Sequence, residues 1–133
     1  MATSRKRYIF NRGTNGATAS AYLGLPIFST PTATIGDVCI RSGSIIGLAV
    51  TLNVTAQTQA GNVVVDVRLE DIVKDSITIA VNGTNVYTAY ELYASDTYTI
   101  TAGNMLSMLI TFGGAQFQGT VSVLGTVIIE NNL

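Results

Sequence analysis

The residues whose chemistry stands out lie in one short stretch, SRKRYIFNRG, at positions 4 to 13. The stretch places four cations around two aromatic rings, and the residues are Arg5, Lys6, Arg7, Tyr8, Phe10 and Arg12. Four of the chain's seven basic residues therefore fall within the first twelve positions. A basic segment with interleaved aromatic residues can bind nucleic acid, a membrane surface or an acidic protein partner.

The distribution of charge separates these partners. Residues 1–12 carry +4, whereas the remaining 121 residues carry three basic and eight acidic side chains, or −5. Four phosphate contacts would give a salt-dependence slope of only about −3.6 on duplex DNA, and the acidic body would repel the duplex. Nucleic acid is therefore disfavoured as a partner. Arginine forms bidentate pairs with carboxylates and the rings of Tyr8 and Phe10 would be apolar anchors, so docking to an acidic protein surface is favoured. A tail that only aids solubility is the alternative.

No residue pattern predicts catalysis. Histidine is absent, which removes the commonest general base and the commonest metal ligand. One stretch, DVRLEDIVKD, concentrates carboxylates, at Asp66, Glu70, Asp71 and Asp75. Such a group could hold Ca²⁺ or provide an acid and a base, but Arg68 and Lys74 lie among the acids without EF-hand spacing, which favours a solvated face. We expect no enzyme activity, no catalytic residue, no metal ion and no cofactor.

The composition indicates a covered surface. Charged residues make up 11% of the chain and hydrophobic residues 47%, whereas a soluble domain has about 25% charged residues. An obligate oligomer, or a domain packed on a larger body, would explain this. The single cysteine, Cys39, is expected to be buried and structural. We find no secretory signal and no apolar run of the roughly 20 residues that span a bilayer, so we expect no membrane association and synthesis in a reducing cytoplasm.

The chain divides into two parts. Residues 1–33, with Pro26 and Pro31 and no sustained periodicity, are expected to form an extended N-terminal arm, and residues 34–133 a β-sandwich domain. Short alternating runs separated by Gly, Asn and Asp predict an all-β fold of about eight strands. A jelly-roll-like two-sheet sandwich accounts for this spacing, and an immunoglobulin-like sandwich is the alternative.

The alternation also predicts which side chains face inward. The expected inward residues are Ile46, Leu48, Val50, Leu52 and Val54; Val63, Val65, Val67 and Leu69; Leu106, Met108, Ile110 and Phe112; and Val121, Val123, Val127 and Ile129. The polar segment TAQTQAGN is expected to join the first two runs as a hairpin-like connection, and Asn-Gly at positions 82–83 predicts a further hairpin turn. Residues 102–104 are expected to turn, and Gly125 to mark a bulge or a close approach of backbones.

The order GSIIGLAVTLNVT, AGNVVVDVRLED, TYTITAGNMLSMLITFGG and GTVSVLGTVIIE resembles the small β-sandwich modules of tailed bacteriophages. These modules occur in capsid decoration (cement) proteins, head fibres and tail-fibre tips. The resemblance covers residues 36 to 130 and is one of strand pattern. It implies a homotrimer of jelly-roll subunits, made in the host cytoplasm, that binds the major capsid protein on the outer capsid surface of the virion, often through an N-terminal arm. Such a protein would stabilise the shell by mass action and would have no catalytic residue.

Two alternatives stay open at this point. One is a head-fibre or tail-fibre tip domain that binds a host receptor, and the absence of a shaft or repeat favours the decoration protein over it. The other is a small jelly-roll coat protein whose basic arm faces the genome. In the favoured interpretation the partner-binding residues are those of the arm: Arg5, Lys6, Arg7, Tyr8, Phe10 and Arg12.

Overall fold

The computed structural model describes residues 3–15, 21–23, 37–55, 61–113 and 120–132. Within these ranges the chain forms ten β-strands and no helix, which confirms the predicted all-β class. Seven strands have eight or more residues: β1 (Thr3–Asn15), β4 (Gly43–Val54), β5 (Gly61–Leu69), β6 (Ile72–Val81), β7 (Asn85–Leu92), β9 (Met105–Gly113) and β10 (Thr120–Asn132). Three are short: β2 (Ala21–Tyr22), β3 (Asp37–Val38) and β8 (Tyr98–Ile100). In this part of the chain no helix has the length and apolar character to cross a membrane.

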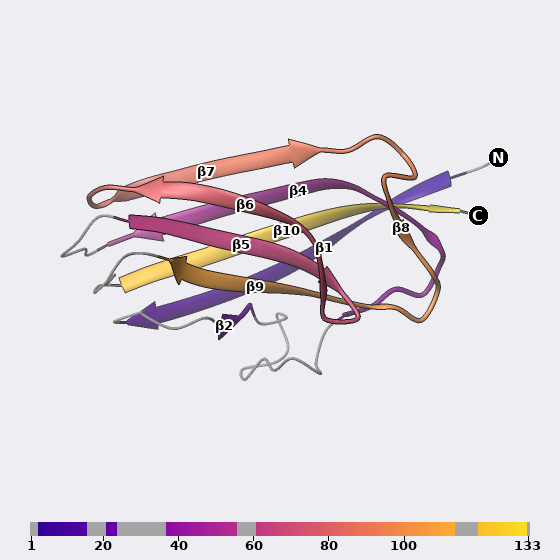
Figure 1. Ribbon diagram of the computed structural model, residues 1–133, viewed down its shortest axis with the longest axis horizontal. Coiled ribbons are helices and arrows are strands. Elements are labelled where there is room, and N and C mark those ends of the chain that lie inside the picture. The colour runs from indigo at the N-terminus through magenta and orange to yellow at the C-terminus, as the bar shows by residue number, and fades with distance from the viewer. Residues whose placement is uncertain (1–2, 16–20, 24–36, 56–60, 114–119, 133) are drawn as a thin grey trace.

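The strands form two antiparallel sheets that pack face to face as a jelly-roll-like sandwich, as predicted. Sheet A has the order β1-β10-β4-β7, with β8 beside β4, and sheet B has the order β2-β9-β5-β6, with β3 beside β9. In Figure 1 sheet B lies in front of sheet A. Each sheet therefore has one face toward the other sheet and one face toward the outside.

The core lies between the sheets and is built by period-2 alternation. Side chains at alternate positions of β4, β5, β9 and β10 point inward and pack across the gap. The predicted inward residues that are buried are Leu48, Val50, Leu52, Val54, Val63, Val65, Val67, Leu69, Leu106, Met108, Ile110, Val121, Val123, Val127 and Ile129. Each fully buried Val, Leu or Ile contributes about 1.5–3 kcal/mol, so these rows hold the two sheets together. The side chain of Phe112 lies outside the described residues.

The predicted inward phase is wrong at Ile46. Ile45 is fully buried, whereas Ile46 is half-buried. The register explains the difference, because Ile129 pairs with Ile45 and Ile128 pairs with Gly47, which leaves Ile46 as the extra residue of a β-bulge. A bulge shifts the alternation by one position, so the inward phase changes between Ile45 and Leu48.

The connections differ from the sequence prediction. β4 and β5 do not pair as a hairpin, because β4 belongs to sheet A and β5 to sheet B. The turn at Asn-Gly is present, with Gly83 at φ 96°, but it leads from β6 of sheet B to β7 of sheet A instead of forming a hairpin within one sheet. The Tyr87 hydroxyl holds this turn, since it donates to the Gly83 carbonyl at 2.8 Å and accepts from the Asn82 amide at 3.1 Å. The turn at 102–104 is also present, with Gly103 at φ 94°.

Two glycines allow close approach inside sheet A. A Cβ at Gly125 would lie 2.5 Å from Met108 Sδ of the facing sheet, so the close approach at this residue is that of a side chain and not, as predicted, of a backbone, and the bulge in the pairing of β10 with β4 lies between Ile128 and Ile129 instead. A Cβ at Gly43 would overlap the backbone oxygen of Glu130 on the neighbouring strand. The absence of a side chain at these two positions lets β10 pack closely against β9 and β4.

Residues 3–15 are extended, as expected for the arm, but they form a strand of the sandwich. β1 pairs antiparallel with β10 along its whole length, from Thr3 opposite Asn132 to Asn15 opposite Thr120. The expected boundary between arm and sandwich, at residues 33 and 34, lies outside the described residues. In Figure 1 the two chain ends lie close together because β1 and β10 are neighbours.

Candidate interaction surfaces

A basic groove lies at the end of sheet A where β1 begins. Its volume is about 310 Å³, and its lining consists of Ser4, Arg5, Lys6, Tyr8, Ile40, Arg41 and Asn131. The lining comes from three segments: the first residues of β1, the loop before β4, and the last residues of β10. The β1-β10-β4 pairing therefore brings Arg5 and Arg41 together although they are far apart in the sequence.

The loop that carries Ile40 and Arg41 is held on both sides by backbone hydrogen bonds. On one side, Cys39 is buried and its amide donates to the Asn104 carbonyl at 2.8 Å. On the other side, the Ser42 carbonyl accepts from the Asn132 amide at 2.9 Å, and the Ser42 hydroxyl accepts from the Ala102 amide at 3.0 Å. The sandwich thus fixes the backbone of Ile40 and Arg41, and it leaves the Ile40 side chain 75% exposed.

The β1 side of the groove is ordered by its own contacts. Arg5 Nε lies 3.5 Å from Glu130 Oε2 on the paired strand, and the Arg5 side chain is 72% exposed. The Lys6 ammonium lies 4.5 Å from the centre of the Tyr8 ring, which is a cation–π contact. Glu130 is thus within reach of one of the three cations of the groove, and the net charge of these four side chains is +2.

This arrangement is suited to a carboxylate-bearing protein segment. Arg5, Lys6 and Arg41 provide charged donors for carboxylates, and the exposed side chain of Ile40 offers an apolar contact beside them. A site of this kind binds by charge-assisted hydrogen bonds and a small apolar anchor.

The six residues predicted to bind a partner have different locations. Arg5 and Lys6 line the groove, and Arg7 is exposed but outside its lining. Tyr8 is only 3% exposed and belongs to the hydrophobic core, so the prediction that it is an exposed anchor is wrong. The backbones of Phe10 and Arg12 lie in β1, and their side chains lie outside the described residues.

Sequence reasoning missed Ile40 and Arg41. In the sequence they follow Cys39, and nothing in the local pattern connects them with the N-terminal cluster. The sequence carried only a weak signal for Tyr8: Tyr8 and Phe10 are two positions apart, so they share one face of an extended strand.

The four carboxylates of DVRLEDIVKD do not converge on one point. Asp66 accepts from Arg68 at 3.2 Å and from the Ser76 hydroxyl at 2.7 Å, and Asp71 accepts from Arg68 at 3.2 Å. Glu70 accepts from the Met105 amide at 2.7 Å. Among the described residues there is no group of three His, Cys, Asp or Glu side chains that could hold a metal ion.

Asp75, the fourth, belongs to a polar cluster that joins the edges of the two sheets. The Tyr93 hydroxyl donates to Asp75 Oδ2 at 2.5 Å and lies 3.4 Å from Glu91 Oε2. Burial acts to raise the pKa of Asp75, but hydrogen bonds from Tyr93, Glu91 and the Ser76 backbone outweigh it and the pKa is lowered.

The pKa values of the two neighbours of Asp75, Glu91 and Tyr93, are raised. The hydrogen bond with Asp75 raises the pKa of Glu91, and burial adds to the effect. Burial, followed by the hydrogen bond with Asp75, raises the pKa of the Tyr93 hydroxyl. Asp75 therefore loses its proton at a lower pH than Glu91 does.

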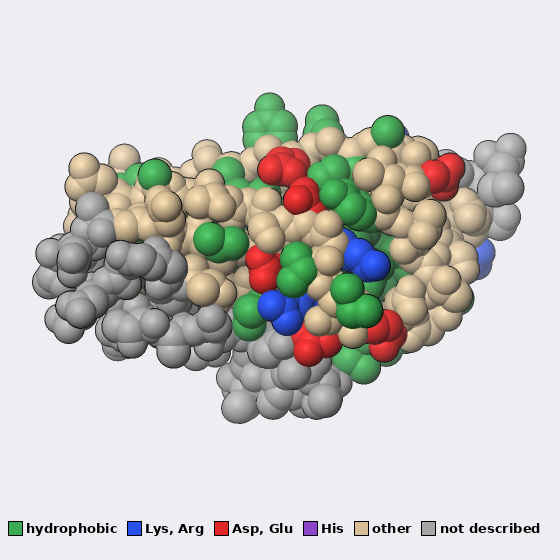
Figure 2. All heavy atoms as spheres, viewed as in Figure 1, with side chains coloured by type: hydrophobic (Ala, Val, Ile, Leu, Met, Phe, Trp, Pro, Cys, Tyr) green, Lys and Arg blue, Asp and Glu red, His purple; other side chains and the backbone are tan. Residues whose placement is uncertain are grey.

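The outer faces of the two sheets have different chemistry. Figure 2, which looks onto sheet B, shows acidic and basic side chains gathered together on that face. Over residues 122–128 of β10, 47–53 of β4 and 86–92 of β7, the outer face of sheet A has twelve outward positions and none is charged: Ser122, Leu124, Thr126, Ile128, Gly47, Ala49, Thr51, Asn53, Val86, Thr88, Tyr90 and Leu92. We call these twelve residues the uncharged face. Charged residues lie at the border of this region, with Glu130 further along β10 and Arg7 of β1 opposite Ile128.

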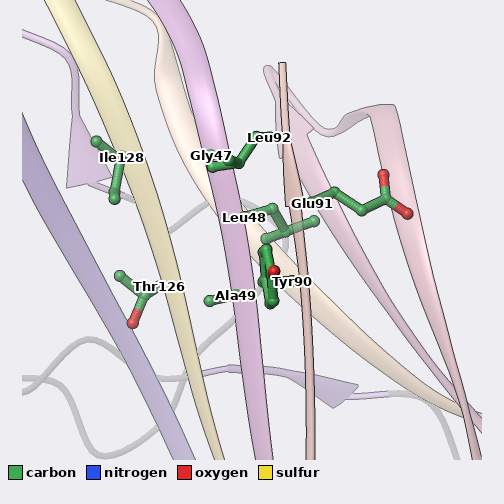
Figure 3. A pocket seen from close by; sticks show the side chains of 8 residues that line it. All are labelled: Gly47, Leu48, Ala49, Tyr90, Glu91, Leu92, Thr126 and Ile128. Carbon is green, nitrogen blue, oxygen red and sulfur yellow. The ribbon is translucent and has the colours of Figure 1, made fainter.

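A shallow groove lies in the uncharged face. It has a volume of about 220 Å³, and its lining is Gly47, Leu48, Ala49, Tyr90, Glu91, Leu92, Thr126 and Ile128. In Figure 3 the side chains of Tyr90 and Leu92 stand at the β7 side of the groove and that of Ile128 at the β10 side, while the Glu91 carboxyl points away. Tyr90 and Leu92 are 75% and 76% exposed, so two large side chains project beside a hollow.

The sequence matches no family model and no curated protein. Its structure is similar to a chain of the virus-like particle of the extra small virus of the giant freshwater prawn Macrobrachium rosenbergii, at 15% identity and a TM-score of 0.40, over 97% of this chain and 80% of that chain. It is also similar to a chain of the T13 viral particle of IBDV (11% identity, TM-score 0.36) and to one of infectious bursal disease virus strain Gx (15% identity, TM-score 0.28). The chain covers 36% and 38% of the lengths of those two proteins, and 98% and 99% of its own length is aligned.

Proposed function

We propose that this chain is a structural virion protein, and that it acts as a capsid decoration protein which docks on the major capsid protein at the outer surface of a phage head. The virion setting comes from the resemblance in strand pattern and from the charge-poor composition. The mode of docking comes from the basic groove, which is the observation that carries the proposal. Three cations of an otherwise acidic molecule meet there beside an exposed isoleucine.

The groove replaces the free arm as the docking element. A free arm would lose conformational entropy when it binds, whereas the first residues of β1 are already ordered by pairing with β10. Arg5, Lys6 and Arg41 are therefore presented in fixed positions to an acidic segment of the partner. Binding to the assembled shell alone would stabilise that shell by mass action.

Charge reversal at Arg41 tests the docking mode. Deleting the first residues would remove a strand of sheet A, so a single surface substitution is the sharper change. We expect Arg41→Glu to weaken binding to purified heads, prepared without this protein, by about tenfold, since it turns an attraction into a repulsion. The measurement is co-sedimentation of the protein with heads at increasing sodium chloride, which should also weaken the wild type.

Lys74→Glu is the matched control. Lys74 is an exposed residue of β6 on the other sheet, and its reversal changes the net charge by the same amount as Arg41→Glu. Equal binding by the Arg41→Glu variant and the wild type would refute the groove as the docking site. Labelling of the protein in virions tests the role itself, because a decoration protein covers the shell and a fibre tip marks one or a few positions.

A further inference from the structure

We propose that the uncharged face of sheet A is an interface between two copies of this chain, in which Tyr90 and Leu92 of each copy fill the groove of the other. This proposal does not depend on the capsid partner. It concerns the opposite chemistry to that of the basic groove, and it is tested with the purified protein alone.

The composition of the uncharged face is the first argument. About a quarter to a third of the residues on a solvated protein surface are charged, yet the twelve residues of the uncharged face carry no charge, and Arg7 and Glu130 lie only at its border. Depletion of charge together with exposed aromatic and aliphatic side chains is typical of the centre of a protein interface. Val86, Tyr90 and Leu92 project from the face with 56%, 75% and 76% of their surface exposed.

The strand register is the second argument, because it places large and small residues at matching levels. On β7 and β4, Leu92 pairs with Gly47 and Tyr90 pairs with Ala49. Each large exposed side chain therefore has the smallest kind of residue beside it on the next strand. The hollow over Gly47 lies between the side chains of Ile128 and Leu92, which would each lie 3.6 Å from a Cβ built there.

This register makes the face complementary to itself. A two-fold axis that runs parallel to β4 and β7, midway between them, exchanges the two strands and keeps every residue at its level. Leu92 of one copy then lies over Gly47 of the other, and Tyr90 lies over Ala49. The same patch supplies both the projecting side chains and the hollows, as an isologous two-fold interface requires. A strongly charged partner would lose the hydration of its charges on this face without gaining a counter-charge.

The size of the face sets the expected affinity. With the axis midway between β4 and β7, these two strands face their copies, and two strands about 4.8 Å apart and eight residues long, at about 3.4 Å per residue, give a flat footprint of roughly 260 Å² per copy. Standard stable interfaces bury about 800 Å² of accessible surface per partner, so this one belongs to the small, reversible class. We therefore expect a dimer that dissociates at micromolar concentration. The homotrimer implied by the strand-pattern resemblance would require a different contact.

Sedimentation velocity over micromolar protein concentrations measures the oligomeric state and tests the proposal. Melting curves recorded by circular dichroism show whether each variant is folded. The wild type should pass from monomer to dimer. Leu92→Asp should weaken the dimer at least about tenfold, because it removes an apolar contact and would bury a carboxylate. Gly47→Val should also weaken it, since the valine methyl groups fill the hollow that receives Leu92. Both positions face outward, so the melting curves should show folded protein.

Ile72→Asp is the matched control. Ile72 is an exposed aliphatic residue at 61% on β6, away from the uncharged face, and its substitution should leave the dimer unchanged. A wild type that stays monomeric would overturn the proposal. So would a trimer, or a dimer that tolerates both Leu92→Asp and Gly47→Val. Loss of the dimer in Leu92→Asp with unchanged binding to heads would separate this interface from the docking groove.

Discussion

The outer faces of the two sheets are built by the same alternation of inward and outward side chains, but their outward side chains differ in charge and in the contacts they make. On sheet B, Asp66 accepts hydrogen bonds from both Arg68 and Ser76, and the side chains of Asp66 and Arg68 are 13% and 18% exposed. On sheet A, the equivalent outward positions hold small, hydroxyl-bearing or apolar residues that leave a hollow beside projecting side chains. The comparison teaches that charged groups on an outer face can find partners within one chain, whereas the large apolar side chains of the uncharged face stay exposed in the single chain.

We expect the largest change in the free energy of unfolding from a substitution on the charged outer face of sheet B, at Asp66. Asp66→Ala removes the carboxylate that accepts from both Arg68 and Ser76, and it leaves a partly buried guanidinium with one carboxylate fewer. Hydrogen bonds to charged groups contribute about 1.5–3 kcal/mol, so we expect the free energy of unfolding to fall by about 2 kcal/mol. Urea unfolding at low protein concentration measures it.

Thr126→Ala is the comparison on the uncharged face. Thr126 lies in the lining of the groove in Figure 3, and its truncation should change the free energy of unfolding by no more than about 0.5 kcal/mol. Equal losses for Asp66→Ala and Thr126→Ala would contradict the contrast between the two faces.

The second prediction compares the two sides of sheet A. Gly125 faces the core, and a Cβ there would lie 2.5 Å from Met108 Sδ and 2.7 Å from its methyl carbon. Since the end of a methionine side chain can move, we expect Gly125→Ala to lower the free energy of unfolding by about 1 kcal/mol, the lower part of the overpacking range.

Gly47→Ala should act in the opposite direction. Its Cβ would meet only ordinary contacts at 3.6 Å on the outer face, and alanine is favoured over glycine within a strand by about 0.5 kcal/mol or more. Thermal melting of the two variants in parallel measures both effects. A lower stability for Gly47→Ala than for Gly125→Ala would contradict the inward and outward assignment of these residues.

The smallest effect concerns the cluster at the edge where the sheets meet. The lowered pKa of Asp75 stabilises the fold above its ordinary value of 3.8, and this contribution is lost as the pH falls through the lower folded value. The raised pKa of Glu91 stabilises the fold below its ordinary value of 4.5, and this contribution is lost as the pH rises through the higher folded value. Together the two contributions are greatest near pH 4.

Glu91→Gln tests the predicted direction of the change in stability with pH. Glutamine imitates the protonated carboxyl, so the variant should lose less stability than the wild type as the pH rises from 4.5 toward neutrality. The measurement is the urea midpoint as a function of pH. Tyr93→Phe is the companion variant, since it removes the hydrogen bond that lowers the pKa of Asp75. Parallel pH profiles for the wild type and Glu91→Gln would show that the cluster does not contribute.

The sequence was sufficient for the strands and most of the core, because alternation reports directly which side chains face inward. It did not predict which strands pair with each other. The runs that became β4 and β5 have the same pattern and are adjacent in the chain, yet they lie in different sheets. The phase error at Ile46 has a similar cause, since a bulge depends on the neighbouring strand and leaves no mark in its own pattern.

The candidate sites were harder to predict than the fold. Two of the three cations of the basic groove, Arg5 and Lys6, could be predicted from the sequence, but Arg41 joins them only through the β1-β10-β4 order. The charge of the N-terminal stretch suggested a free arm, and its three consecutive cations give no alternating pattern that would have identified Tyr8 as a core residue. The uncharged face left only a global trace, the low charged fraction of 11%.

The pairing of β1 with β10 also governs the order of events during synthesis. Among the strands that the structure describes, β1 has only β10 beside it in sheet A. Each residue of β1 pairs with a β10 residue that follows it by more than a hundred positions. The basic strand must therefore remain without a partner on the ribosome until β10 has emerged, and contacts of such long sequence separation form slowly. Tyr8 enters the core only at that stage, so closure of sheet A should be a late step of folding.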